Sequence, residues 1–152
     1  MIVLAPLLIG VIAGLRTMIA PAVVAWADWL GWIDLSATWA NFLASPWAVG
    51  VLSILALGEF VADQLPSTPS RKTPMQFGAR LLTGGLSGAA LGAVAGGAVL
   101  GLAAGLVGAV AGTLGGAWAR GRLAAAFGSD RPAAFLEDAV AILGGLVIVA
   151  LV

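Results

Sequence analysis

The sequence contains no cysteine, histidine or tyrosine among its 152 residues. The missing cysteines exclude disulfides and thiol nucleophiles, and the missing histidines exclude imidazole bases and the usual zinc ligands. We therefore expect no metal site and no cofactor. Acid–base chemistry is left to seven carboxylates, and anion binding to the seven Lys and Arg side chains or to backbone amides.

Charge is scarce as well, with 9% charged residues against 61% hydrophobic ones and a mean hydropathy of +1.09. Soluble domains carry about a quarter charged residues and roughly half apolar ones. A soluble fold of this length could not bury so much apolar surface, so we expect one integral membrane domain over residues 1–152, with the lipid bilayer as its surroundings. The formal net charge is zero and the basic residues are scattered, which excludes a nucleic-acid-binding face.

The apolar runs predict an all-α, polytopic bundle of five transmembrane helices. The predicted spans cover residues 4–25, 47–65, 77–96, 100–119 and 133–152. The uncharged run 81–119 would make a helix of roughly 58 Å, almost twice a hydrocarbon core of about 30 Å. We expect it to fold back between Gly96 and Gly101. Three prolines in residues 66–74 predict a loop after the second span.

The distribution of basic residues predicts the orientation of the bundle. Two loops, after the second and the fourth span, together contain Arg71, Lys72, Arg120, Arg122 and Arg131. The positive-inside rule places both loops in the cytoplasm, with the N-terminus inside and the C-terminus outside. The expected location is the bacterial inner membrane. A charge at position 16 interrupts the first apolar run, so we expect no cleaved signal peptide.

Five of the six tryptophans lie between the ends of the first and second spans. They are Trp26, Trp29, Trp32, Trp39 and Trp47. Indole rings prefer the headgroup level of a bilayer. We predict that segment 27–46 lies in the outer interface, with a short helix near residues 36–43. An aromatic belt that anchors the protein is the favoured interpretation, and a lid over an outward-facing cavity is the alternative.

Glycine recurs on one face of the third and of the fourth span. The two stripes are Gly84, Gly88, Gly92 and Gly96 in the third span and Gly101, Gly105, Gly108, Gly112 and Gly116 in the fourth. Helices in lipid associate through close backbone contact, which small residues permit. The stripes predict packing of the two spans in one chain, and a homo-oligomer interface is the alternative.

The most informative feature is a set of ionisable residues among the apolar runs. A charge at the bilayer centre costs roughly 2.5–3.5 kcal/mol on insertion scales, so such residues are expected to pair inside the bundle. The predicted charged cavity, in the inner half of the bundle, consists of Arg16, Thr17, Glu59, Asp63, Arg80, Glu137 and Asp138. Its four carboxylates outnumber its two arginines.

Two interpretations of this cluster stay open. In the first, it lines a water-filled cavity of a small transporter or channel, where surplus carboxylates bind a cation or relay protons. In the second, Arg16 bridges Glu59 and either Glu137 or Asp138, and the charges only hold helices together in a structural or accessory protein. An enzyme is not expected, because the pair Glu59 and Asp63 could hold Mg²⁺ but no second acidic motif accompanies it.

Short motifs along the chain resemble a known family. They are Gly14-Leu15-Arg16 with Pro21, Glu59-Phe-Val-Ala-Asp63-Gln-Leu-Pro66, Arg80 with Gly84 and Gly88, and Leu136-Glu137-Asp138. They are similar to a bacterial family of small polytopic membrane proteins known only as domain of unknown function 4126. Its members often carry Arg-Pro where this chain has Arg80-Leu81. The resemblance implies the membrane architecture and the same charged residues, but names no substrate.

Overall fold

The computed structural model describes residues 2–65 and 70–152, and every regular element in these residues is a helix. In chain order the elements are α1 (Leu4–Leu15), α2 (Ile19–Trp29), the short 3₁₀ helix η1 (Trp39–Ala44), α3 (Pro46–Asp63), α4 (Pro74–Val94), α5 (Ala98–Phe127) and α6 (Asp130–Ala150). The predicted all-helical class is confirmed. Within the described residues, α3, α5 and α6 are long and apolar enough to cross a membrane. Residues 66–69 of the predicted proline-rich loop lie outside the described residues.

The predicted first span, 4–25, is wrong as a single helix. Helix α1 ends at Leu15 and α2 begins at Ile19, with an extended backbone at Arg16 between them. Pro21 gives the physical reason. In a continuous helix it could not bond to the carbonyl group of Thr17, and its ring would clash with that group. In the broken arrangement Pro21 lies in the first turn of α2, where its missing N–H has no helical partner to lose.

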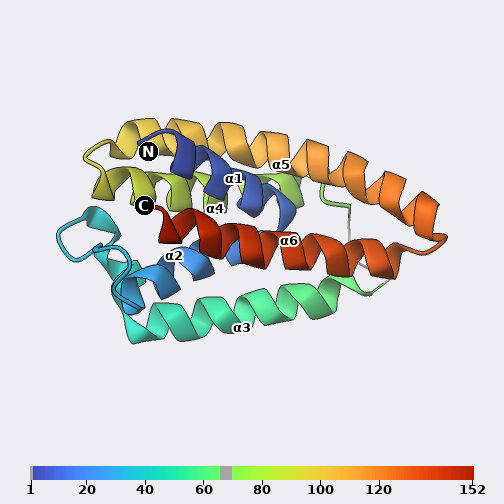
Figure 1. Cartoon of the computed structure of the whole chain (residues 1–152), viewed down its shortest axis with the longest axis horizontal. Coiled ribbons are helices and arrows are strands. Elements are labelled where there is room, and N and C mark those ends of the chain that lie inside the picture. Colours follow the sequence, from blue (N-terminus) through green and yellow to red (C-terminus); the bar gives the residue numbers. More distant parts are fainter. Residues whose placement is uncertain (1, 66–69) are drawn as a thin grey trace.

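At this break the chain also reverses direction. Helix α1 runs parallel to α5, because Gly10 faces Gly105 and Gly14 faces the later residue Thr113. Helix α2 then returns along α3: Met18 bonds to Glu59, whereas Trp26 bonds to the earlier residue Ser53. The segment is thus a helical hairpin, and Figure 1 shows both chain termini at the same end of the bundle. The sequence prediction placed the termini on opposite sides of the membrane, whereas the hairpin brings them to one end of the bundle.

Glycines allow α4 and α5 to touch backbone to backbone. A Cβ atom added at Gly88 would lie 2.5 Å from the carbonyl oxygen of Gly101, and one added at Gly92 would lie 2.7 Å from that of Gly97. These distances leave no room for a side chain. The glycine contacts join helices of one chain, which is the interpretation of the stripes that the sequence favoured.

Two details of the predicted glycine pattern differ in the structure. Gly96 does not belong to the stripe on α4, since it forms the turn between α4 and α5 with φ +75° and nothing near its Cβ position. The later glycines of α5 face α1 instead of α4: Gly108 meets the backbone of Leu7, and Gly112 meets that of Val11. Helix α1 therefore packs into a groove of α5 that only glycine provides.

The tryptophan-rich connection between α2 and α3 lies at the end of the bundle where both termini lie (Figure 1). All five of its predicted anchors are exposed, up to 84% for Trp47. The predicted short helix is present as η1. The acidic residues here are held locally: Asp28 accepts from the Leu35 amide at 2.7 Å, and the hydroxyl and amide of Ser36 both donate to Asp34. These bonds hold the pKa of Asp34 below its ordinary value.

Helix α3 is the outermost helix of the bundle, beside α2 (Figure 1). Only Val49 and Ala56 are buried along its length, while Ile54, Leu57 and Val61 are at least 60% exposed. Exposed apolar surface of this extent is compatible with lipid and costly in water. The fold subdivides accordingly into a tight unit of α1, α4 and α5, a middle layer of α2 and α6, and α3 outside.

Candidate functional site

The candidate site forms where the helical hairpin turns, and its first component is a buried arginine of α4. Arg80 is 3% exposed, and its Nη1 donates to the carbonyl oxygens of Gly14 and Leu15 at 2.9 and 2.8 Å. These carbonyl groups end α1, where the helix dipole is negative and the last carbonyls have no helical partner. Arg80 thus caps the C-terminal end of α1.

Glu59, a carboxylate of α3, caps the N-terminal end of α2. The two oxygens of Glu59 accept hydrogen bonds from the backbone N–H groups of Thr17 and Met18, at 2.7 and 2.8 Å. Anions are stabilised at helix N-termini by the free N–H groups and the dipole. Arg80 and Glu59 also form an ion pair of 4.0 Å with each other. The two ends of the broken helix are therefore held by one cation and one anion.

Arg16, at the break itself, is fully buried and forms ion pairs with Asp63 of α3 and Asp138 of α6. An extended backbone at this residue lets its side chain reach two helices at once. Contact with Asp138 was one of the alternatives predicted from the sequence. Contact with Glu59 was also predicted and does not occur, because Glu59 binds the backbone amides instead. Phe60 lies 5.9 Å from the Arg16 guanidinium carbon and covers its face.

The sequence interpretation missed two arginines of the site, because they are loop-proximal and were counted only for orientation. Arg71 makes two hydrogen bonds to Glu137, at 2.5 and 2.8 Å. Arg120 bonds to Asp63 at 2.9 Å, to Glu137 at 3.3 Å and to Asp130 through two nitrogens. A signal for Arg120 was its position directly after the uncharged run 81–119, at the end of the predicted fourth span.

The observed cluster therefore contains four arginines and five carboxylates. Its members are Arg16, Arg71, Arg80, Arg120, Glu59, Asp63, Asp130, Glu137 and Asp138. All seven residues of the predicted cavity lie in or beside it, since Thr17 contributes its amide. The predicted two-to-one excess of carboxylates is wrong, because Arg71 and Arg120 join the cluster and only Asp130 is added on the acidic side.

Gly116 of α5 makes space for part of this network. A Cβ atom there would lie 3.0 Å from Nη1 of Arg71 and 3.2 Å from Oε1 of Glu137. Both distances are tighter than ordinary van der Waals contact, so a larger residue would push the ion pair apart. The last glycine of the α5 stripe thus serves the charged site and not the contact with α4.

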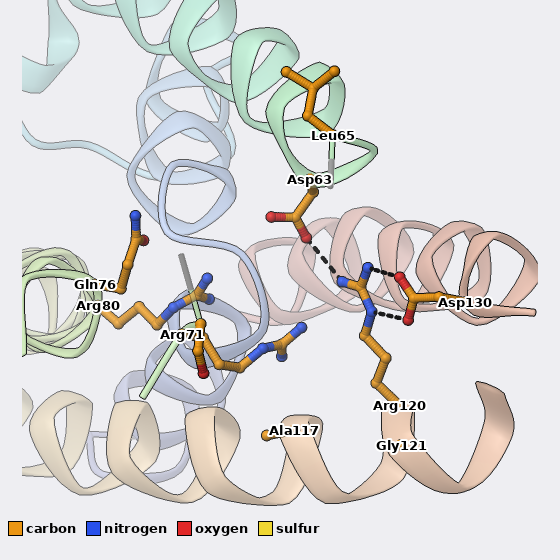
Figure 2. A pocket seen from close by; sticks show the side chains of 10 residues that line it. Asp63, Leu65, Arg71, Gln76, Arg80, Ala117, Arg120, Gly121 and Asp130 are labelled. Atoms are coloured by element: carbon orange, nitrogen blue, oxygen red, sulfur yellow. Dashed lines mark hydrogen bonds and ion pairs between the residues drawn. The ribbon is translucent and has the colours of Figure 1, made fainter. Parts of the chain in front are cut away.

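A pocket of about 440 Å³ opens beside the cluster, and Figure 2 shows its side chains. Its ionisable lining consists of Asp63, Asp130, Arg71, Arg80 and Arg120. In Figure 2 the side chains of Arg71 and Arg80 extend in the same direction, toward Arg120, and Arg120 lies between the two aspartates. Ser70 and Gln76 add polar groups. Of the seven residues predicted for the charged cavity, Asp63 and Arg80 line this pocket, and Arg71, Arg120 and Asp130 complete its ionisable wall.

Comparison with known proteins gives a family and no closer analogue. No curated protein and no solved structure matches the chain. The family described as "Domain of unknown function (DUF4126)" matches residues 3–152. This match covers both halves of the hairpin, the charged site and the glycine-rich helices. The chain belongs to the DUF4126 family.

Proposed function

We propose that this protein is a small transporter or channel for an ion or small solute in the bacterial inner membrane. In this proposal α3, α4, α5 and α6 cross the bilayer, and the α1–α2 hairpin enters from and returns to one side. The four-crossing arrangement replaces the five spans expected from the sequence. Support comes from the 21 residues of α4, a length of about 31 Å, and from its close antiparallel contact with α5.

The same proposal places the charged site at the cytoplasmic face. Six of the seven basic residues belong to α4, α5, α6 or the loops at the end where α3 meets α4 and α5 meets α6. At the opposite end, Asp28 and Asp34 have no basic residue near them in sequence. The positive-inside rule then puts both chain termini outside the cell. The pocket would open toward the cytoplasm.

The observation that carries the proposal is the broken helix at the charged pocket. Non-helical backbone at membrane depth is tolerated where it is buried in protein or lines a cavity, and transporters use broken helices to bind their solutes. Here the break is capped by Arg80 and Glu59, both of which can exchange partners without breaking a covalent or apolar contact. The turn between α1 and α2 is thus the segment best suited to move during transport, since α1 itself packs backbone to backbone against α5.

A liposome experiment tests the proposal. Purified protein is reconstituted, and uptake of radiolabelled sodium, rubidium, chloride and phosphate is compared with empty liposomes. We expect at least one tracer to enter through the protein, and Glu59→Gln to slow that entry about tenfold because the capping charge of α2 is lost. Arg122→Gln is the control, since Arg122 contacts Trp118 and lies outside the pocket.

Absence of uptake for every tracer would overturn the transporter proposal. Strong and unchanged uptake by Glu59→Gln would exclude Glu59 from the pathway. A structural or accessory role is the second candidate, and one observation favours it. Each of the five carboxylates is bonded to an arginine or to a backbone amide, as a network that only holds helices together would require.

A further inference from the structure

We infer that the pocket beside the helix break binds an oxyanion, a phosphate or carboxylate group, and not a cation. This inference names the solute class for the proposed transport site and rests on that proposed function for its physiological meaning. It departs from the cation or proton expected from the sequence. Three arginines and two aspartates form the ionisable lining, so the wall itself carries one net positive charge.

Hydrogen-bond accounting gives the first argument. Both oxygens of Glu59 accept from backbone amides, both oxygens of Glu137 accept from Arg71, and both oxygens of Asp130 accept from Arg120. A cation entering the pocket would have to displace an arginine or a helix end to gain these ligands. Asp63, which also lines the pocket, pairs through its Oδ2 with both Arg16 and Arg120. A cation would therefore compete with an arginine or a helix end at each of these four carboxylates.

Arg80 supplies the second argument. This side chain lines the pocket, yet it is 97% buried, and within residues 2–65 and 70–152 its Nε has no hydrogen-bond partner. A buried donor of a charged group is costly to leave without an acceptor. Arg71, another cation, lines the same pocket (Figure 2). An oxyanion between them would accept from Arg80 and relieve the repulsion between the two charges.

Arginine also suits this ligand by shape. The planar guanidinium group presents paired N–H donors that match two oxygens of a carboxylate or phosphate. Ser70 and Gln76 could donate further hydrogen bonds from the pocket wall. Two sources offer the same chemistry: a free anion from the cytoplasm, and the phosphate of an anionic lipid headgroup, which basic pockets at the inner leaflet also bind.

Binding of radiolabelled inorganic phosphate to the purified full-length protein in neutral detergent tests the inference without relying on transport. We expect saturable binding that competes with acetate and is weakened roughly tenfold or more by Arg80→Gln. Since Arg80 caps α1, this variant can fail to fold. Gln76 forms part of the wall and is half-buried, so Gln76→Glu and Gln76→Lys give a matched pair with opposite expected effects.

The outcomes separate the possible sources and the two proposals. Weaker binding in Gln76→Glu, stronger binding in Gln76→Lys and no change in Arg122→Gln support the pocket as an oxyanion site. Displacement of phosphate by phosphatidylglycerol in mixed micelles, but not by phosphatidylcholine, assigns the site to a lipid headgroup. No phosphate or phosphatidylglycerol binding, or equal binding in both Gln76 variants, overturns the inference. Cation uptake in liposomes without anion binding overturns the inference alone, whereas anion binding without any uptake overturns transport alone.

Discussion

The two ends of this bundle are held together by different physical means. Between α1, α4 and α5, glycine backbones touch directly, as at Gly88 and Gly101, and no polar side chain is needed. Around the break, ion pairs connect Arg16 and the loop residue Arg71 with four helices, α3, α4, α5 and α6. Single groups have several partners: Arg120 binds three carboxylates, and Asp63 binds two arginines. Lipid offers little hydrophobic drive for helix association, so close backbone contact at one end and ion pairs at the other must hold the helices together.

The comparison teaches where the molecule can move. Glycine contacts permit one arrangement only, because a shift of one residue brings a side chain against a carbonyl group. Ion pairs with shared partners permit several arrangements of similar energy, since Arg120 can release one carboxylate and keep another. We therefore expect the glycine-rich unit to be the rigid scaffold and the charged end to be the variable part.

The largest expected effect is the loss of Arg16. Arg16→Leu leaves Asp63 without one partner and Asp138 with none of its ion pairs in the described residues, both beside a buried leucine. Breaking a buried pair costs about 3–5 kcal/mol. The apparent melting temperature in detergent should fall strongly, while Arg122→Gln should change it little. Equal stability of Arg16→Leu and wild type would show that the cluster does not hold the bundle.

A smaller effect is expected in the glycine-rich unit, where the same added methyl group should act in opposite directions at two positions of α5, Gly108 and Gly115. Gly108→Ala would put its Cβ against the Leu7 carbonyl oxygen, and overpacking costs about 1–3 kcal/mol. Gly115→Ala meets no atom within 4 Å and should stabilise the helix by up to about 1 kcal/mol. Unfolding in mixed micelles measures both. The same sign for both substitutions would rule out the backbone contact of α1 with α5.

Glu59→Gln should act on the hairpin turn with an effect of about 1.5–3 kcal/mol, the range of a hydrogen bond to a charged group. The amide NH₂ of glutamine cannot accept from a backbone N–H, so Thr17 or Met18 loses its acceptor. Hydrogen exchange of these two amides should become roughly tenfold faster. Asp28→Asn is the control, because it should affect the Leu35 amide and leave the turn unchanged. Unaltered exchange at both Thr17 and Met18 would contradict the capping role.

The smallest effect is expected at the tryptophan-rich end. Trp26 donates from its indole nitrogen to the Ser53 hydroxyl at 2.9 Å, a bond worth about 1 kcal/mol or less at an exposed position. Trp26→Phe and Ser53→Ala should each lower stability slightly, and the double variant should lose no more than either one. Additive losses would mean that this bond does not join α2 to α3.

Much of the architecture could be predicted from the sequence, because composition and apolar length depend on lipid and not on tertiary detail. The helical class, the fold-back near Gly96, the short helix in the tryptophan-rich segment and the location of Arg16 in a charged cluster follow from such local rules. The hairpin could have been predicted too, since Pro21 breaks the helix four residues earlier. Because the apolar run 4–25 has the length of one membrane span, the sequence interpretation treated it as a single helix and did not use Pro21 as a break.

The details of the charged site could not be predicted, because they depend on which groups face each other after folding. Glu59 and Asp63 share a helix face, yet one binds backbone amides of α2 and the other binds two arginines. Arg71 and Arg120 lie outside the apolar runs and join the cluster only because folding brings both of them to Glu137 of α6. The excess of carboxylates over arginines counted along the apolar runs therefore does not predict the net charge of the folded site.

Single-cysteine labelling tests the central claim, that the chain reverses at Arg16 and brings both termini to one side. The sequence has no cysteine of its own, so Ile2→Cys, Val152→Cys and Ser129→Cys each carry one reactive thiol. With a membrane-impermeant maleimide on intact cells, the account predicts labelling at positions 2 and 152 and protection at position 129 until the membrane is opened. Labelling of positions 2 and 152 from opposite sides would contradict it and restore a continuous first span.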